Sequence, residues 1–436
     1  MSTAPPSTVT LGVIARSFWP LAVSWLLMSF EQPAVAIAVA RLTAPEVNLA
    51  AWGGVVFPIA LVIEAPIIML LAASTALSVD ARSYAALHRF THRISAALTT
   101  LHALVAFTPL FDVIVERWLE VPTQVVEPAR LGLQLMTPWT WAIASRRFHQ
   151  GVMIRFGYSR IVGVGTALRL LVSGLSLTVG VLVGLPGVVV AGCAIISSVT
   201  TEALYTALRV RPIVRAHLAR VGDEPPLAGW AFFHFYFPLS LTPLCALLAQ
   251  PIGAAALSRM PAPLESLAAW PILAGLVFVF QSGGLAYNEV VVAHVGTAGA
   301  QRALRRFTAL LLALALVAQL LFAATPLAER FLITVNDLSP DLSDMIVDAL
   351  WLAIPISSLR ALESWYQGVL VHARRTRAIT ESVAIFLLIV AATLVIGVVV
   401  QGAPGLTYAA LAFTLGHVAQ AAWQRWRVHP YLARLP

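Results

Sequence analysis

Two arginines stand in the middle of an otherwise apolar stretch, in the sequence SRRFHQ at residues 145–150. On a helix, Arg146, His149 and Gln150 would share one face, because side chains three and four residues apart lie one above the other. Guanidinium groups bind carboxylate and phosphate oxygens through two parallel hydrogen bonds. The segment therefore predicts an anion site formed by Arg146 and Arg147, with His149 and Gln150 beside them. His149 could also couple protons, or be a buried neutral hydrogen-bonding side chain.

The apolar stretch ends near Arg155, so both arginines would lie about 12 Å inside a helix that rises about 1.5 Å per residue. An arginine at that depth reaches the membrane surface only with difficulty, and it usually lines a cavity or contacts a partner. The alternative to anion binding is a structural ion pair of Arg146 or Arg147 with Glu31 or Glu64.

A matching polar stripe follows in the second half of the chain, where Gln367 corresponds to Gln150 (367 − 150 = 217). Arg360 and Gln367 are predicted to contact the same anion. Arg360 and Glu363 stand three residues apart, so on a helix they would neutralise each other. Glu363 takes the place of Arg146, and such an asymmetric polar lining is what a single non-symmetric solute would require.

Glu31, Gln32 and Pro33 interrupt the apolar stretch of residues 19–41. Proline lacks a backbone N–H, so the helix is predicted to be weakened or kinked there. An ionisable group at this depth costs about 2.5–3.5 kcal/mol, so it usually faces a cavity or a partner. A hydrogen bond that only stabilises helix packing is the alternative for Glu31.

These embedded residues are assigned two roles. We expect hydrogen bonds to the substrate from the glutamines and charge tuning or ion coupling from the acids, namely Gln32, Gln250 and Gln367 for the first role and Glu31, Glu64 and Glu363, together with His149, for the second.

The chain consists of two repeated halves. Gln32-Pro33 returns as Gln250-Pro251 (250 − 32 = 218), and Gln150-Gly151-Val152 returns as Gln367-Gly368-Val369. Proline and glycine positions shared in one order over two halves are a strong repeat signal. Each half holds about six apolar spans, an even number, so both halves enter the membrane from the same side and form parallel repeats.

The composition is that of a polytopic membrane protein, since 59% of the 436 residues are hydrophobic and only 11% are charged. The predicted fold class is all-α, with about 12 transmembrane helices in two parallel six-helix pseudo-repeats. The predicted domains are a six-helix bundle at 1–210, a cytoplasmic linker at 211–228 and a second six-helix bundle at 229–436. Short interfacial helices are expected at 111–128 and 325–344.

Every basic residue is an arginine, and the arginines gather in the loops of one face while acids gather in the opposite loops. The positive-inside rule then places both termini in the cytoplasm and the protein in the plasma membrane, the inner membrane of a bacterium. This topology accounts for the net charge of +8, so we expect membrane lipids and no nucleic acid as partners.

Sequence signatures of enzymes are missing, among them HExxH, a P-loop and a glycine-rich nucleotide fingerprint. No clustered aspartates suggest a metal. We therefore expect no enzyme, no cofactor and no metal. Cys193 and Cys245 stand inside apolar segments and are expected to be small core residues.

Short motifs resemble the progressive ankylosis (ANK) family, namely Phe18-Trp19-Pro20-Leu21, Phe30-Glu31-Gln32-Pro33, His149-Gln150-Gly151 and Gln250-Pro251-Ile252. That family is similar to the superfamily of multidrug-and-toxin extrusion (MATE) transporters and lipid-linked oligosaccharide flippases. The resemblance covers essentially the whole chain. It implies two six-helix bundles arranged as a V with a central cavity, alternating access, and export of small anions such as citrate, pyrophosphate or nucleotides.

Our leading interpretation is a secondary transporter that exports a small polyvalent organic or phosphorylated anion, with H⁺ or Na⁺ as candidate coupling ions. One alternative is a cation or drug antiporter that uses Glu31 and Glu64. Another is a flippase for a lipid-linked precursor, in which the arginines contact a pyrophosphate headgroup. A major facilitator fold and a scaffold protein without transport activity are further alternatives.

Overall fold

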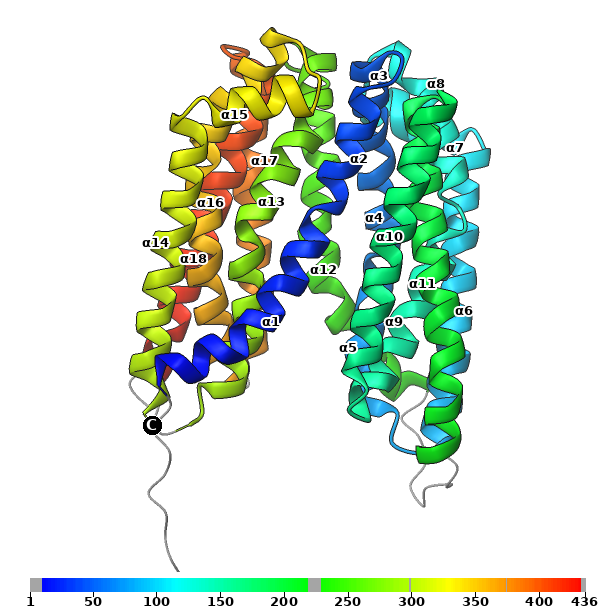
Figure 1. Cartoon of the computed structure of the whole chain (residues 1–436), viewed down its shortest axis with the longest axis vertical. Coiled ribbons are helices and arrows are strands. Elements are labelled where there is room, and N and C mark those ends of the chain that lie inside the picture. Colours follow the sequence, from blue (N-terminus) through cyan, green and yellow to red (C-terminus); the bar gives the residue numbers. More distant parts are fainter. Residues whose placement is uncertain (1–9, 219–228, 298, 374, 433–436) are drawn as a thin grey trace, which may run out of the picture. The chain divides into compact units, whose positions relative to one another are not determined.

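The computed structural model describes residues 10–218, 229–297, 299–373 and 375–432, and all regular secondary structure in these ranges is helical (Figure 1). Within them, eight helices are long and apolar enough to cross a membrane, or up to nine if a bent pair is one span. A helix satisfies its backbone N–H and C=O groups internally, which a membrane interior demands. The prediction of an all-α polytopic membrane protein is confirmed.

The bounds of the helices follow the predicted spans. In the first half they are α1 (Leu11–Ser29), α2 (Glu31–Ala40), α3 (Pro45–Leu49), η1 (Ala50–Val56), α4 (Phe57–Ile68), α5 (Leu70–Leu77), α6 (Ala81–Phe107), α7 (Leu110–Asp112), η2 (Val113–Trp118), α8 (Thr123–Leu135), α9 (Trp139–Arg155), α10 (Ser159–Val183) and α11 (Gly187–His217). In the second half they are α12 (Gly229–Leu257), α13 (Pro263–His294), α14 (Ala300–Ala324), α15 (Leu327–Arg330), η3 (Phe331–Val335), α16 (Pro340–His372), α17 (Thr376–Val400) and α18 (Gly405–Leu432).

The first span is interrupted where the proline predicts it. Helix α1 ends at Ser29 and α2 begins at Glu31, with Phe30 between them. The Ser29 hydroxyl donates a hydrogen bond of 2.7 Å to the carbonyl oxygen of Leu26. The Pro33 ring packs so closely on α13 that a methyl group at Gly275 would lie 3.3 Å from it. The predicted break is confirmed, and it places Glu31 at the first residue of α2.

The repeat extends to backbone conformation. Three pairs of equivalent residues adopt the left-handed conformation at the same places in both halves, at offsets of 217 or 218 residues: Ala44 and Ala262, Glu120 and Asp337, Gly184 and Gln401. Non-glycine residues adopt this conformation rarely, so the pairing reflects a shared fold.

A side-chain bond to the start of a later helix is also repeated. The Val188 N–H donates to Asn48 Oδ1 at 3.0 Å, and the Leu406 N–H donates to Ser266 Oγ at 3.3 Å. Both partners are shifted by 218 residues (266 − 48 and 406 − 188). In each half this bond satisfies a helix-start N–H that would otherwise lack a partner.

The predicted interfacial segments are short turns of helix. Residues 110–118 form α7 and η2, and α6 bends by 82° into them. Residues 327–335 form α15 and η3 at the equivalent place in the second half. Short interfacial helices in the loops at 111–128 and 325–344 are therefore confirmed.

The chain forms two compact units, and each takes helices from both sequence halves. Unit 1 comprises Met1–Pro33 and Arg259–Pro436, and unit 2 comprises Ala34–Ser258. Helix α1 thus packs with the second-half helices α13 and α14, along which it runs in Figure 1, and α12 packs on α4 of the first half. The division into bundles at 1–210 and 229–436 stays a prediction, and residues 219–228 of its linker lie outside the described residues.

Aromatic contacts hold the two exchanged helices. In unit 1, Phe18 of α1 meets Phe307 of α14 edge to face, with ring centroids 5.1 Å apart. In unit 2, Phe90 of α6 meets Phe232 of α12 at 4.5 Å, and the Tyr236 hydroxyl donates to the carbonyl oxygen of Pro66. That carbonyl lies beside the break between α4 and α5, so α12 covers it.

Candidate functional site

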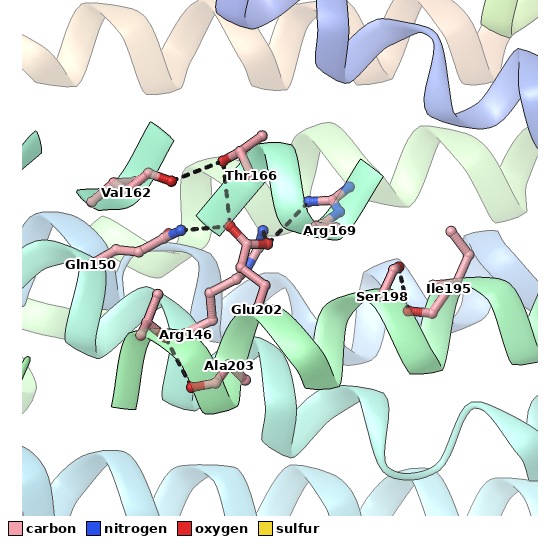
Figure 2. A network of polar contacts seen from close by, with 10 residues as sticks. Arg146, Gln150, Val162, Thr166, Arg169, Ile195, Ser198, Glu202 and Ala203 are labelled. Carbon is pink, nitrogen blue, oxygen red and sulfur yellow. Dashed lines mark hydrogen bonds and ion pairs between the residues drawn. The ribbon is translucent and has the colours of Figure 1, made fainter. Parts of the chain in front are cut away.

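A buried carboxylate in unit 2, Glu202 of α11, gathers donors from two neighbouring helices (Figure 2). Arg146 Nη1 of α9 donates to Glu202 Oε2 at 2.7 Å, and Gln150 Nε2 donates to Oε1 at 3.0 Å. From α10, the Thr166 hydroxyl donates to Oε1 at 3.4 Å, and Arg169 Nη1 lies 3.8 Å from Oε2. Glu202 is fully buried, so these contacts compensate the cost of removing its charge from water.

Helix periodicity explains why the donors converge. Arg146 and Gln150 stand four residues apart on α9, and Thr166 and Arg169 stand three apart on α10, so each pair lies on one helix face. The predicted polar face of α9 is confirmed for Arg146 and Gln150, whereas the expected ionic partner of Arg146 is wrong. Its carboxylate is Glu202, because α9 packs on α11.

A second pair of charges in unit 2 lies between α4 and α9. Glu64 is buried, and among all charged groups Arg147 attracts its carboxyl group most strongly, followed by Arg146. Within the described residues, neither Glu64 Oε2 nor Arg147 Nε has a hydrogen-bond partner. Arg147 is thus the embedded guanidinium of α9 that forms no ion pair with a described carboxylate.

The charges of this region do not balance. Three guanidinium groups, on Arg146, Arg147 and Arg169, face two carboxylates, on Glu64 and Glu202, which leaves one positive charge in excess (3 − 2 = 1) when all are ionised. An uncompensated charge in a low-dielectric region attracts an ion of opposite sign strongly. The arrangement can therefore hold an anion beside Arg147.

Unit 1 contains a related buried carboxylate, Glu363 of α16. Arg360 Nη1 donates to Glu363 Oε2 at 2.8 Å, which confirms the predicted neutralisation between residues three apart. His417 of α18 contacts Glu363 Oε1 through Nδ1 at 2.9 Å. The sequence interpretation missed His417, because spacing along a chain gives no register between α16 and α18.

The two buried ion pairs have opposite polarity in the repeat. Glu363 occupies the position of Arg146 (363 − 146 = 217), so the base stands on the fourth span of the first half and the acid on the fourth span of the second. The position of Glu202 is taken by Gln420 (420 − 202 = 218), and His417 precedes it by one helical turn. Both halves join the same two spans by an ionisable pair, but they exchange the acid and the base.

His149 lies on another face of α9. Its Nδ1 is 3.4 Å from the Ser145 hydroxyl, and its ring centroid is 6.5 Å from that of His88 on α6. His88 and His92 are linked at 3.2 Å between their Nε2 atoms. The histidines of α6 were not predicted as neighbours. In the described part of the chain, no group of histidine, cysteine or acidic side chains is arranged to hold a metal ion.

The predicted site residues are divided between the two units. Glu31, Gln32, Arg360, Glu363 and Gln367 belong to unit 1, and Glu64, Arg146, Arg147, His149, Gln150 and Gln250 belong to unit 2. A single site formed by both groups stays a prediction. Within unit 2, the structure brings Arg146 and Gln150 to one carboxylate and places Arg147 near Glu64.

The fold is that of transporters of the MOP superfamily. A multidrug resistance MATE family transporter in an inward-facing conformation matches with a TM-score of 0.68 and 13% sequence identity, over 95% of this chain and 99% of that chain. A MOP superfamily transporter from Pyrococcus furiosus, described by the reverse polarity of its binding pocket, matches with a TM-score of 0.66 and 14% identity, over 96% of both chains. The lipid II flippase MurJ, in an inward closed conformation, matches with a TM-score of 0.62 and 13% identity, over 93% of this chain and 87% of that chain.

No protein-family model matches the chain, and no curated protein matches it. The likeness to solved structures therefore establishes the MATE-like fold of the whole chain, and the resemblance to the ANK family stays a prediction.

Proposed function

We propose that this protein is a secondary active transporter that exports a small polyvalent anion, such as a citrate-, pyrophosphate- or nucleotide-like solute, by alternating access. The MATE-like fold over nearly the whole chain supports transport. The short motifs that resemble the ANK family support an anionic substrate. Both termini would lie in the cytoplasm, as the distribution of arginines predicts.

The state of Arg147 supports an anion most directly. Arg146 and Arg360 already contact Glu202 and Glu363, so their guanidinium groups are held by carboxylates. Arg147 forms no ion pair with a described carboxylate, and its buried Nε has no hydrogen-bond partner there. A carboxylate or phosphate group would supply that partner through two parallel hydrogen bonds. Arg147 is therefore our first choice for the residue that contacts the substrate.

Flux measurements in proteoliposomes test this role. Arg147→Ala should lower the export of citrate or pyrophosphate at least about 10-fold, because a charged hydrogen bond of about 1.5–3 kcal/mol is lost. Arg147→Lys should retain part of the flux, since it keeps the charge without the planar fork. Arg160→Ala removes an exposed arginine at the start of α10 and serves as the matched control. Unchanged anion flux in Arg147→Ala would refute the proposal.

A second candidate function is a proton- or cation-coupled antiporter for drugs or organic cations. It is favoured by Glu64, whose buried Oε2 has no hydrogen-bond partner in the described residues, and by the multidrug MATE neighbours. Efflux of a lipophilic cation that is abolished by Glu64→Gln, without any anion transport, would select this function. The structural likeness to MurJ keeps a lipid-linked precursor flippase as a third, and headgroup translocation assays would reveal it.

A further inference from the structure

A basic cavity lies in unit 1 between α14, α16 and α18, apart from the buried ion pairs. Its volume is about 610 Å³. Arg305 comes from α14, Tyr366 from α16, and Arg425 and His429 from α18. The remaining wall is largely apolar: Leu312, Leu362 and Trp365 continue along the helices. The cavity thus combines cationic and hydrogen-bonding groups with a hydrophobic surface.

The positive charges of this cavity have no counterion in the protein. Arg305 and Arg425 are exposed, and no carboxylate in the described ranges pairs with either. The contrast is a neighbouring cavity of about 400 Å³, which is also lined by His429. There Arg427 pairs with Glu381 at 3.4 Å, and Arg375 lies over the ring of Tyr431. The uncompensated charge is therefore concentrated in the larger cavity.

The depth of the charges matches the surface of a membrane. Arg305 is five residues from the start of α14, and Arg425 is seven residues from the end of α18, so both lie about 7–11 Å inside their helix ends. Basic pockets between transmembrane helices at this level bind the headgroups of anionic lipids. We propose that this cavity binds the phosphate of an anionic phospholipid through Arg305 and Arg425, with the acyl chains along the apolar wall.

The repeat shows that the pair of arginines is particular to the second half. His88 stands in the place of Arg305 (305 − 88 = 217), and Ala207 stands in the place of Arg425 (425 − 207 = 218). A requirement of the shared fold would act on both halves alike, so the fold itself does not account for two arginines here. A ligand bound to one half does.

Lipid binding to the purified full chain tests the proposal. The protein is titrated in detergent with short-chain phosphatidylglycerol, with phosphatidylcholine and with inorganic phosphate, and the shift of the melting temperature is followed. Phosphatidylglycerol should stabilise the wild type more than phosphatidylcholine does. Arg305→Gln/Arg425→Gln should weaken phosphatidylglycerol binding about 30-fold, which corresponds to about 1 kcal/mol for each arginine.

Arg302→Gln/Arg306→Gln is the matched control, since it removes two exposed arginines of α14 that do not line the cavity. This variant should retain wild-type binding. Equal loss in both double variants would show only general surface attraction and would overturn the proposal, as would no loss in either. Equal stabilisation by inorganic phosphate would show that a free anion, and not a lipid, occupies the cavity. If Arg305→Gln/Arg425→Gln is unstable, Arg425→Gln alone should weaken binding about 5-fold, and unchanged binding would overturn the proposal.

Discussion

Arg146 Nη1 of α9 lies 2.7 Å from Glu202 Oε2 of α11, and both side chains are buried. This ion pair joins two helices that the chain separates by the whole of α10. Gln150 and Arg169 complete the contacts of the same carboxylate (Figure 2). The pair therefore belongs to the structural frame of unit 2, and it positions Arg147, the next residue on α9.

The two partners of this pair should differ in their effect on stability. Glu202→Ala leaves the guanidinium groups of Arg146 and Arg169 without their shared carboxylate, and should cost about 3–5 kcal/mol in the free energy of unfolding. Arg146→Ala leaves Glu202 with Gln150, Thr166 and Arg169, and should cost only about 1–3 kcal/mol. Thermal unfolding of the purified variants measures the difference.

Glu381→Ala is a control for the loss of a carboxylate near the helix ends. Glu381 pairs with Arg377 and Arg427 at 3.3 and 3.4 Å but remains partly exposed, so its removal should cost less than about 1 kcal/mol. A cost for Arg146→Ala equal to that of Glu202→Ala would contradict the shared-carboxylate arrangement.

His417 should stabilise unit 1 through its contact with Glu363. An ionised carboxylate only accepts hydrogen bonds, so Nδ1 of His417 is the donor. His417→Leu should therefore lower the free energy of unfolding by about 1.5–3 kcal/mol. His429→Leu removes an exposed histidine of the same helix and should change it by less than about 0.5 kcal/mol. Chemical or thermal unfolding in detergent compares them, and equal effects would speak against the hydrogen bond.

Local features of the structure could be predicted from the sequence. Pro33 removes a backbone donor, and the helix is interrupted at Phe30. Arg360 and Glu363 are three residues apart on one helix, so their contact needs no knowledge of the tertiary structure. The repeat was visible in proline and glycine positions, and it extends to the left-handed residues Ala44 and Ala262.

Contacts between helices could not be predicted. Arg146 was expected near Glu31 or Glu64, because the sequence contains no information on which faces of α9 and α11 meet at Glu202. His417 escaped notice for the same reason. The packing of α1 with helices of the second half was also missed, since a repeated sequence suggests that each half packs with itself.

The start of α6 should respond to acid. The Ser83 backbone N–H donates to Asp80 Oδ1 at 2.8 Å, and this hydrogen bond holds the pKa of the Asp80 carboxyl below its ordinary value of 3.8. A lowered folded-state pKa means that the stabilisation is present above the unfolded pKa and is lost as the pH falls through the folded pKa. Hydrogen exchange at the Ser83 and Tyr84 amides should accelerate in the wild type below about pH 4.

Asp80→Asn is the matched variant, because it keeps a side-chain oxygen that can cap the helix but cannot titrate. Exchange at these amides in Asp80→Asn should show no additional acceleration in acid. An identical pH response in both proteins would assign the effect to another group.

Gly151 allows α9 to approach α5 closely. A methyl group at this position would lie 1.8 Å from Ser74 Oγ and 2.4 Å from the carbonyl oxygen of Leu71. The hydroxyl could rotate away, but the backbone carbonyl cannot, so the two helices would have to separate. Its repeat partner Gly368 is equally close-packed, with a methyl group 2.3 Å from Val291 Cγ1. The Gln-Gly-Val motif thus marks a helix contact in both halves.

Gly151→Ala should therefore destabilise the protein by about 1–3 kcal/mol, the usual cost of overpacking a well-packed contact. Gly174→Ala is the matched control within a neighbouring helix, because nothing lies within 4 Å of its added methyl group. That control should be neutral or stabilising by up to about 1 kcal/mol, since alanine has the higher helix propensity. Melting temperatures of the two purified variants compare them directly. A Gly151→Ala protein as stable as Gly174→Ala would mean that α5 and α9 can separate at no cost, and the close contact would then not be what holds α9 and its arginines in place.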